Sequence, residues 1–154
     1  MKYSCTILLF IICLTFTFAQ KKQAIYAEFG GNALIYSLNY DFAPIKNHDN
    51  FRLKAGVSYI GDPVIIGQVS YLFGKEKHFF ELGAGFTTVT EAVTGDSGFQ
   101  IYPNAALQYR YQHPRGFLFR IGFAPLYLPI TGDGFEGLNI IYWAWPGVSF
   151  GYGF

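Results

Sequence analysis

Residues 147–154 have the sequence GVSFGYGF, in which bulky apolar side chains alternate with glycine or serine. Val148, Phe150, Tyr152 and Phe154 share one parity, and only small residues occupy the other. Successive side chains of a β-strand point to opposite faces. The segment therefore predicts a strand with one bulky apolar face and one small face.

The same alternation recurs through the chain after residue 20, and turn-forming residues divide it into eight predicted strands. The first division is open: if Gly30-Gly31-Asn32 is a bulge inside one long strand rather than a turn, only seven strands remain. The predicted strands cover residues 24–31, 33–43, 51–60, 64–74, 78–90, 99–112, 116–128 and 142–154.

The composition differs from that of ordinary soluble domains. Of 154 residues, 51% are hydrophobic, 20% are aromatic and only 14% are charged, with a mean hydropathy of +0.23. Soluble domains carry roughly 25% charged residues. The formal net charge of +1 offers no attraction to a nucleic-acid backbone, so we expect no nucleic-acid partner.

Residues 1–19 resemble a secretory signal peptide, with Lys2 near the start, an apolar stretch from Ile7 to Phe18 and the small Ala19 before the expected cleavage point. We therefore expect 20–154 to form the mature barrel domain. Both cysteines of the sequence precede residue 20, so the mature chain has no thiol for a disulfide or a metal site. The longest aliphatic or aromatic run after residue 20 spans 140–145, far short of the about 20 residues of a membrane helix.

Alternation alone does not decide which face meets the surroundings, because a soluble barrel buries its apolar set and a membrane barrel exposes it. The number of large side chains decides. The apolar parity holds far more Leu, Ile, Val, Phe and Tyr residues than the roughly 12 inward side chains of a packed three-layer barrel. We therefore predict an all-β fold: an eight-stranded antiparallel up-and-down transmembrane β-barrel whose apolar face points outward.

The opposite parity combines small residues with charges of both signs, three acids and four bases. Buried charges need partners, so we predict a lumen charge network that fills the barrel as a plug and excludes a general diffusion pore. A proton relay or a ligand clamp is the alternative role. The predicted network residues are Glu28, Asp41, Arg52, Lys54, Glu81, Arg110 and Arg120.

The terminal segment resembles the closing strand of outer-membrane β-barrel proteins, with Phe154 last, Tyr152 two residues before it and Phe150 upstream. The whole mature chain resembles the small OmpA-like or OmpX-like barrels of Bacteroidota-type bacteria, without a peptidoglycan-binding domain. The resemblance implies a Gram-negative outer-membrane location and both termini in the periplasm. It also implies recognition of the three aromatic residues by the barrel-assembly machinery.

With both termini in the periplasm, the extracellular and periplasmic connections differ in charge. The predicted extracellular connections hold acids only, at Asp62, Glu91, Asp96, Asp133 and Glu136. The amino tail and periplasmic turns hold the bases Lys21, Lys22, Lys46, Lys75, Lys77 and Arg115, with Asp49 and Glu76. Acidic loops are ordinary solvated surface, or they bridge through divalent cations to lipopolysaccharide. We expect outer-membrane lipid and lipopolysaccharide as partners, and any surface partner stays open.

The sequence offers no catalytic constellation. His48, His78 and His113 fall in or beside predicted periplasmic turns, without metal-ligand spacing and without a matching serine partner. Glycine pairs such as Gly83 and Gly85 lie in strands with no helix behind them, so they form no phosphate-binding loop. We expect no enzyme activity, no cofactor and no bound metal.

Two features of the outer rim keep alternatives open. Pro103, Pro125 and Pro146 each remove a ladder donor near the outer ends of three consecutive strands. They indicate either bulges at the rim or a lateral opening for a lipid chain. Nearby aromatic residues predict an interfacial belt: Tyr127, Tyr142, Trp143 and Trp145.

Three functional hypotheses follow. The first is a non-enzymatic, porin-like integral outer-membrane barrel with a side-chain-filled lumen and acidic extracellular loops, serving envelope structure or surface recognition. The second is a lipid-handling barrel, either a lipid A-modifying enzyme or a hydrophobe conduit. The third is a soluble periplasmic barrel that binds a small hydrophobe.

Overall fold

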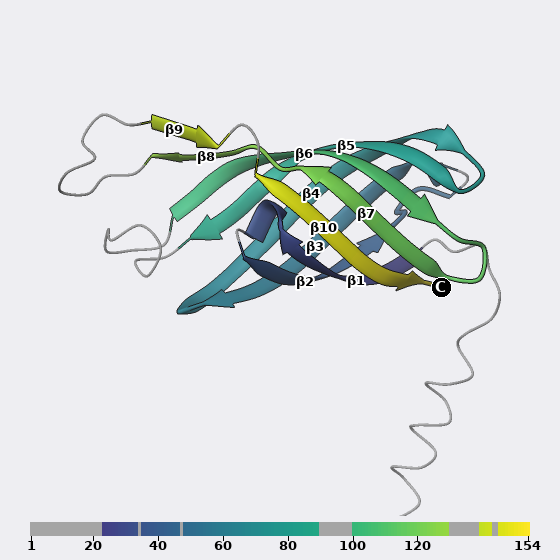
Figure 1. Ribbon diagram of the computed structural model, residues 1–154, viewed down its shortest axis with the longest axis horizontal. Coiled ribbons are helices and arrows are strands. Elements are labelled where there is room, and N and C mark those ends of the chain that lie inside the picture. The colour runs from purple at the N-terminus through teal and green to yellow at the C-terminus, as the bar shows by residue number, and fades with distance from the viewer. Residues whose placement is uncertain (1–22, 34, 47, 90–99, 130–138, 143–144) are drawn as a thin grey trace, which may run out of the picture.

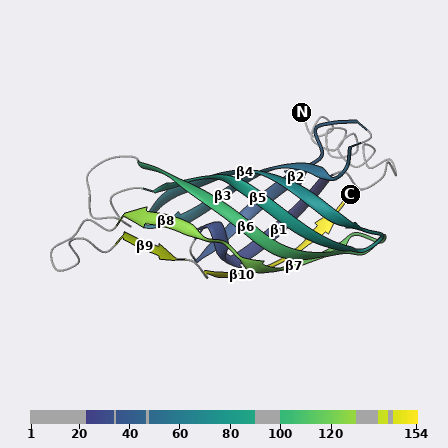
Figure 2. The ribbon, with the colours of Figure 1, turned by 90° about the horizontal axis from the view of Figure 1, so that it is seen from above.

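The computed structural model describes residues 23–33, 35–46, 48–89, 100–129, 139–142 and 145–154. They form ten strands and one short 3-10 turn, arranged as a tilted barrel (Figures 1 and 2). The elements are β1 (Gln23–Gly30), η1 (Gly31–Ala33), β2 (Tyr36–Phe42), β3 (Phe51–Ile60), β4 (Asp62–Lys75), β5 (His78–Val89), β6 (Gln100–Gln112), β7 (Phe117–Phe123), β8 (Leu126–Pro129), β9 (Asn139–Tyr142) and β10 (Pro146–Gly153).

The wall of the closed barrel has eight strand positions, and neighbouring strands are antiparallel. Consecutive strands pair from β1 to β7, β7 pairs with β10, and β10 returns to β1. The short strands β8 and β9 pair with each other. Since β8 follows β7 along the chain and β9 precedes β10, the two short strands continue β7 and β10 beyond the barrel wall (Figure 1). The predicted eight-stranded up-and-down barrel is confirmed.

The two ends of the barrel differ. One end, here called the turn end, holds the Glu76-Lys77 turn between β4 and β5, the turn at 113–116 and Phe154. Glu76 lies in the left-handed region with φ 60°, which suits a two-residue hairpin connection. The other end, here called the loop end, holds η1 and the β8–β9 hairpin (Figure 1).

The first connection is a turn and not a bulge. Gly30 and Gly31 adopt φ values of 72° and 65°, a conformation that side chains with a Cβ rarely take, and the chain continues as η1. The Gly30 N–H donates to the Ile35 carbonyl at 2.7 Å, which closes the reversal. The second strand therefore begins at Tyr36, three residues later than predicted.

The structure corrects two predicted strands near the proline residues. The predicted strand 116–128 stops at Phe123 and resumes at Leu126, because Pro125 has no N–H to donate. The predicted strand 142–154 begins at Pro146, and β9 covers residues 139–142, where the long final connection was expected either to continue its strands or to offer a partner an apolar edge. Backbone hydrogen bonds continue across the break, from Ala105 N–H to the Pro125 carbonyl at 3.1 Å and from Ala124 N–H to the Trp145 carbonyl at 2.9 Å.

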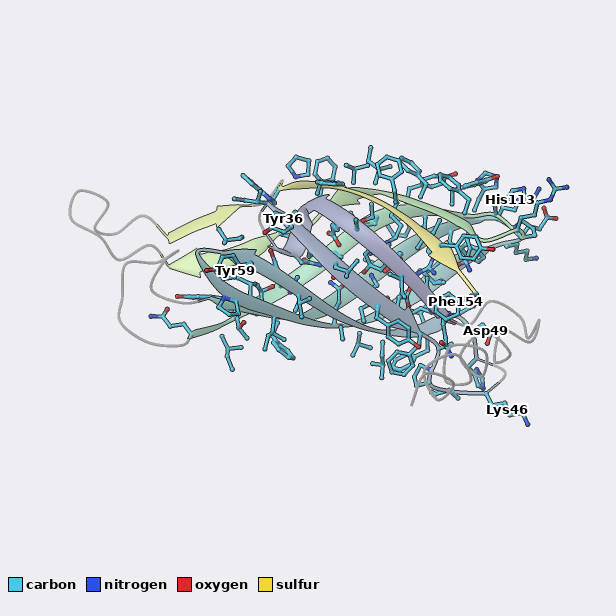
Figure 3. All side chains as sticks on the ribbon, turned by 90° about the horizontal axis from the view of Figure 1, so that it is seen from below. Tyr36, Lys46, Asp49, Tyr59, His113 and Phe154 are labelled. Carbon is cyan, nitrogen blue, oxygen red and sulfur yellow. The ribbon has the colours of Figure 1, made fainter. Side chains whose placement is uncertain are left out.

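The side chains confirm the inside-out assignment. Tyr36 is 44% exposed and Phe150 is 48% exposed, whereas all seven predicted lumen charges are at most 5% exposed (Figure 3). Large apolar residues form a band around the outside, with members on all eight wall positions. They include Ile25, Phe29, Leu38, Val57, Ile65, Val69, Phe80, Leu82, Ile101, Leu107, Ile121 and Phe150.

The lumen also contains apolar side chains. Ala24, Tyr26 and Leu118 pack together as one buried cluster, and Val64 and Ile66 form another. No helix within the described residues is long and apolar enough to cross a membrane.

Candidate functional site

The candidate site is the set of buried charges in the barrel lumen, contributed by six different strands. Glu28 comes from β1, Asp41 from β2, Glu81 from β5 and Arg110 from β6, and the remaining three bases come from β3 and β7. Each residue lies on the parity opposite to the apolar band, so its side chain points inward. The structure brings six of the seven into one network and leaves Glu28 apart.

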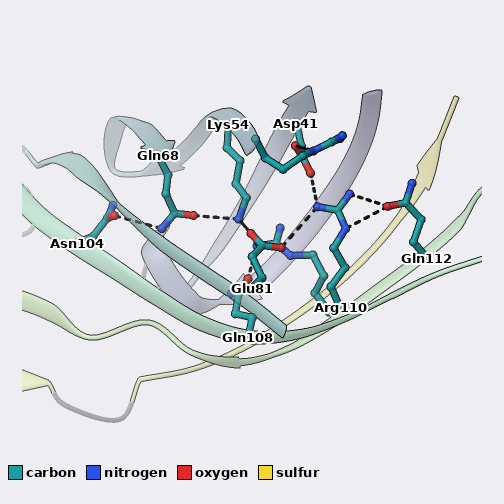
Figure 4. Close-up of polar contacts among 10 residues, drawn as sticks. Asp41, Lys54, Gln68, Glu81, Asn104, Gln108, Arg110 and Gln112 are labelled. Carbon is teal, nitrogen blue, oxygen red and sulfur yellow. Dashed lines mark hydrogen bonds and ion pairs between the residues drawn. The ribbon is translucent and has the colours of Figure 1, made fainter. Parts of the chain in front are cut away.

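Two carboxylates hold the four bases. Asp41 accepts hydrogen bonds from Arg52 Nε at 2.7 Å and from Arg110 Nη1 at 2.5 Å (Figure 4). Glu81 pairs with Lys54, with Arg110 Nη1 at 3.5 Å and with Arg120 Nη2 at 3.3 Å. Arg110 therefore links the two carboxylates.

The strand register explains why Glu81 is central. Arg110 on β6 and Arg120 on β7 lie directly opposite each other, and like charges in that position repel. Glu81 contacts both guanidinium groups and offsets this repulsion. The Arg120 guanidinium also lies 4.5 Å from the centroid of the Tyr26 ring, a favourable cation–π arrangement.

Neutral side chains extend the network toward the loop end. Lys54 donates to Gln68 Oε1 at 3.0 Å, and Gln68 donates to Asn104 Oδ1 at 3.4 Å (Figure 4). Asn104 Nδ2 donates to Thr87 Oγ1 at 2.7 Å. Thr87 in turn donates to the carbonyl of Asn32 in η1 at 2.9 Å. A polar chain thus runs from the charge network to the inner face of the first connection.

The other end of the network reaches the turn end. Arg110 donates through Nε and Nη2 to Gln112 Oε1, at 3.2 and 2.9 Å. Gln112 and Arg52 lie at the inner wall of a recess of about 360 Å³ that opens at this end. The polar side chains therefore occupy the lumen along most of its length.

The sequence prediction missed the neutral members of this chain, Gln68, Thr87, Asn104, Gln108 and Gln112. Thr87 shares the inward parity of Glu81 on β5, and Asn104, Gln108 and Gln112 share that of Arg110 on β6, whereas β4 contributes Gln68 and none of the predicted lumen charges. That parity was the available signal, but the predicted network included only ionisable residues.

Glu28 lies apart from the six networked residues. Its side chain turns toward η1, where an added Cβ on Gly31 would overlap Oε1 and one on Gly147 would lie 3.4 Å from it. Within the described residues, Glu28 Oε1 has no hydrogen-bond partner although the residue is only 2% exposed. Glu28 shares burial and parity with Asp41, but it has no arginine within ion-pair distance.

The residues of the terminal segment lie at the seam where the barrel closes. Phe150 contacts Phe119 with ring centroids 5.3 Å apart, and the Tyr152 ring covers Gly116. The Phe154 N–H donates to the Gln23 carbonyl at 2.9 Å, and Gln23 returns a hydrogen bond at 3.3 Å. The structure thus pairs the end of this segment with the start of β1.

The predicted outer aromatic belt falls mostly outside what the structure describes. Trp143 lies outside the described residues, and the side chains of Tyr127 and Tyr142 are not described. Trp145 is partly exposed and accepts the hydrogen bond from Ala124 through its carbonyl. The signal peptide and the acids Glu91, Asp96, Asp133 and Glu136 also lie outside the described residues.

An aromatic group at the turn end was not predicted. The Tyr111 ring lies 5.3 Å from His78, 6.3 Å from His113 and 6.4 Å from Phe117, measured between centroids. The His78 ring nitrogen Nδ1 also forms a 2.6 Å hydrogen bond with the Tyr109 hydroxyl. Two of the three histidines thus belong to an aromatic group, and no set of three His, Cys, Asp or Glu residues in the described part of the chain could hold a metal.

Comparison with known proteins supports the fold. No family model and no curated protein matches the sequence. The crystal structure of the N-terminal β-barrel domain of Pseudomonas aeruginosa OprF is similar, with a TM-score of 0.57 and 16% sequence identity. The match covers 87% of this chain and 98% of that domain. The chain thus has the fold of a small, OmpA-like, eight-stranded barrel, as predicted.

Proposed function

We propose that this protein is a non-enzymatic integral outer-membrane β-barrel whose lumen is closed by the Asp41–Glu81 charge network. One observation carries the proposal: large apolar side chains cover the outside on every wall position, while every buried charge of the described residues lies inside. Contact of such an apolar exterior with water is unfavourable, whereas contact with lipid chains is favourable. Strands of transmembrane barrels show the same alternation, with apolar side chains outward and polar side chains inward. The likeness in fold to the OprF barrel domain supports the same assignment.

The proposal includes an orientation and a set of partners. The turn end, with both Gln23 and Phe154, faces the periplasm, and the loop end faces outward with its acidic connections toward lipopolysaccharide. Residues 1–19 act as a signal peptide, and Phe150, Tyr152 and Phe154 are recognised during barrel assembly. The contribution to the cell is envelope structure or surface recognition.

The lipid-handling alternative finds no particular support at the proline residues. The hydrogen bonds on both sides of Pro125 keep the neighbouring strands connected, as expected for a bulge at a barrel rim. We therefore retain the non-enzymatic assignment.

The membrane assignment is tested by gel migration. Protein extracted from outer membranes in mild detergent is expected to migrate faster before boiling than after, because the closed ladder keeps the barrel compact in the unboiled sample. Recovery in the soluble periplasmic fraction, with the same mobility before and after boiling, would contradict the proposal. A soluble periplasmic protein serves as the fractionation control.

The closed lumen predicts low permeability. Liposomes that contain the folded barrel are expected to take up sucrose no faster than empty liposomes, because a continuous chain of side-chain contacts spans the lumen from Gln112 to Thr87. Uptake is measured by light scattering during osmotic swelling, with a general porin at equal protein content as the positive control. Swelling at the rate of the porin would show that the side chains do not close the barrel.

A further inference from the structure

The buried charges of the lumen do not balance. Among the buried side chains of the described residues, four bases face three acids, an excess of one positive charge. The imbalance is greater within the network itself, where Asp41 and Glu81 serve all four bases and Glu28 lies apart. An uncompensated charge in a low-dielectric interior is costly, so this arrangement favours entry of a counter-ion.

Unpartnered donors gather around Arg120. Arg120 Nε and Nη1, Gln108 Nε2 and Ser149 Oγ are buried and have no hydrogen-bond partner within the described residues. Their three residues are at most 1% exposed. One acceptor can take hydrogen bonds from the Gln108 amide, the Ser149 hydroxyl and one of the two guanidinium nitrogens, because Nε–H and the Nη1 hydrogens point to different edges of the guanidinium.

The register places these donors together. Arg120 on β7 lies directly opposite Ser149 on β10, and both side chains point inward. On the other side, Arg120 Nη2 donates to Gln108 Oε1, so the amide of Gln108 lies beside the guanidinium. Glu81 and Gln108 Oε1 both contact Nη2 of Arg120, whereas Nε and Nη1 have no hydrogen-bond partner among the described residues.

We propose that the lumen binds one small monovalent anion of the halide class between Arg120, Gln108 and Ser149. One such ion offsets the excess positive charge of the buried side chains and accepts hydrogen bonds from Gln108, Ser149 and one guanidinium nitrogen of Arg120. Glu28 also faces Ser149 across the β1–β10 pair, and its Oε1 lies beside Gly31 and Gly147. The site depends only on the folded lumen, so it stands whether or not the membrane assignment is correct.

A second arginine provides an internal comparison. Arg52 lies directly opposite Ser70 on β4, and Arg52 Nη2 and Ser70 Oγ are also buried without a partner in the described part of the chain. This position offers one guanidinium nitrogen and no unpartnered amide, whereas the Arg120 position offers two nitrogens and the amide of Gln108. We therefore assign the anion to Arg120 and use Ser70 as the matched control.

The test measures stability against anion identity. The barrel is folded in zwitterionic detergent and unfolded with urea in sodium chloride, sodium bromide or sodium gluconate at equal ionic strength and pH 7. Chloride and bromide are expected to raise the urea midpoint in a saturable manner relative to gluconate, because an ion that binds only the folded state stabilises it by mass action. Equal midpoints in all three salts at every concentration would overturn the proposal and indicate water at these donors.

Three variants locate the effect. Gln108→Glu places a negative charge beside Arg120, and it is expected to abolish the difference between chloride and gluconate without loss of folding. Ser149→Ala removes one donor and is expected to raise the chloride concentration of half effect about tenfold, as expected for a hydrogen bond to a charged group. Ser70→Ala is expected to leave that concentration unchanged. A chloride effect that survives Gln108→Glu, or that is lost in Ser70→Ala but kept in Ser149→Ala, would place the ion elsewhere and overturn the assignment.

Discussion

A Glu81→Gln variant is expected to lose about 3–5 kcal/mol of unfolding free energy, the usual cost of removing one partner of a buried ion pair. Glu81 contacts Lys54, Arg110 and Arg120, and the neutral amide cannot compensate any of these charges. Arg110 retains Asp41, but among the described residues Arg120 and Lys54 then have no carboxylate within ion-pair distance. The repulsion between the facing arginines is also no longer offset.

The measurement is urea unfolding of the barrel refolded into zwitterionic vesicles, followed by tryptophan fluorescence and by the gel shift. Glu76→Gln is the matched control, because Glu76 is exposed in the turn between β4 and β5. Its expected change is within about 0.5 kcal/mol, as for surface substitutions generally. If the two variants are equally stable, the contacts of Glu81 contribute no net stability to the lumen.

The sequence predicted the faces of the wall much better than the contacts inside it. Alternation assigned Glu28, Asp41 and Glu81 correctly to the inward face, because parity depends only on the local pleat. Parity does not give the height of a residue in a tilted barrel or the residue that it meets across the lumen. The pairing of Arg120 with Glu81 joins β7 to β5 across two strand registers, and no local pattern encodes it. Glu28 was grouped with the network for the same reason.

The ends of the strands were predicted less well, each for a local reason. Pro125 interrupts a segment that otherwise alternates, and the alternation concealed the break between β7 and β8. The continuous apolar run at 140–145 has no period of two, so it did not fix the boundary between the last connection and the predicted strand from residue 142, and β9 crosses that boundary. The adjacent glycines at 30 and 31 suited both a bulge and a turn, and only their φ values distinguish the two.

An Ile121→Arg variant is expected to lose about 2–4 kcal/mol of unfolding free energy in a bilayer, the cost of an arginine facing lipid near the midplane. Ile121 is 50% exposed on the outer face of β7, between Tyr109 and Val148 on the neighbouring strands. The Ile121→Arg substitution changes only an outward-facing side chain, so it breaks no hydrogen bond of the lumen. The loss therefore measures what surrounds the barrel and not what fills it.

Ile45→Arg is the matched control, because Ile45 is 47% exposed but lies in the connection after β2 at the turn end. An arginine there reaches water or lipid headgroups, so the expected change is within about 0.5 kcal/mol. Both variants are unfolded with urea in the same zwitterionic vesicles. A soluble barrel that binds a hydrophobe predicts a different pair of results: both exposed isoleucines then face water, and both substitutions are close to neutral. A small loss for Ile121→Arg that equals the loss for Ile45→Arg would therefore exclude lipid as the neighbour of β7 and contradict the membrane assignment.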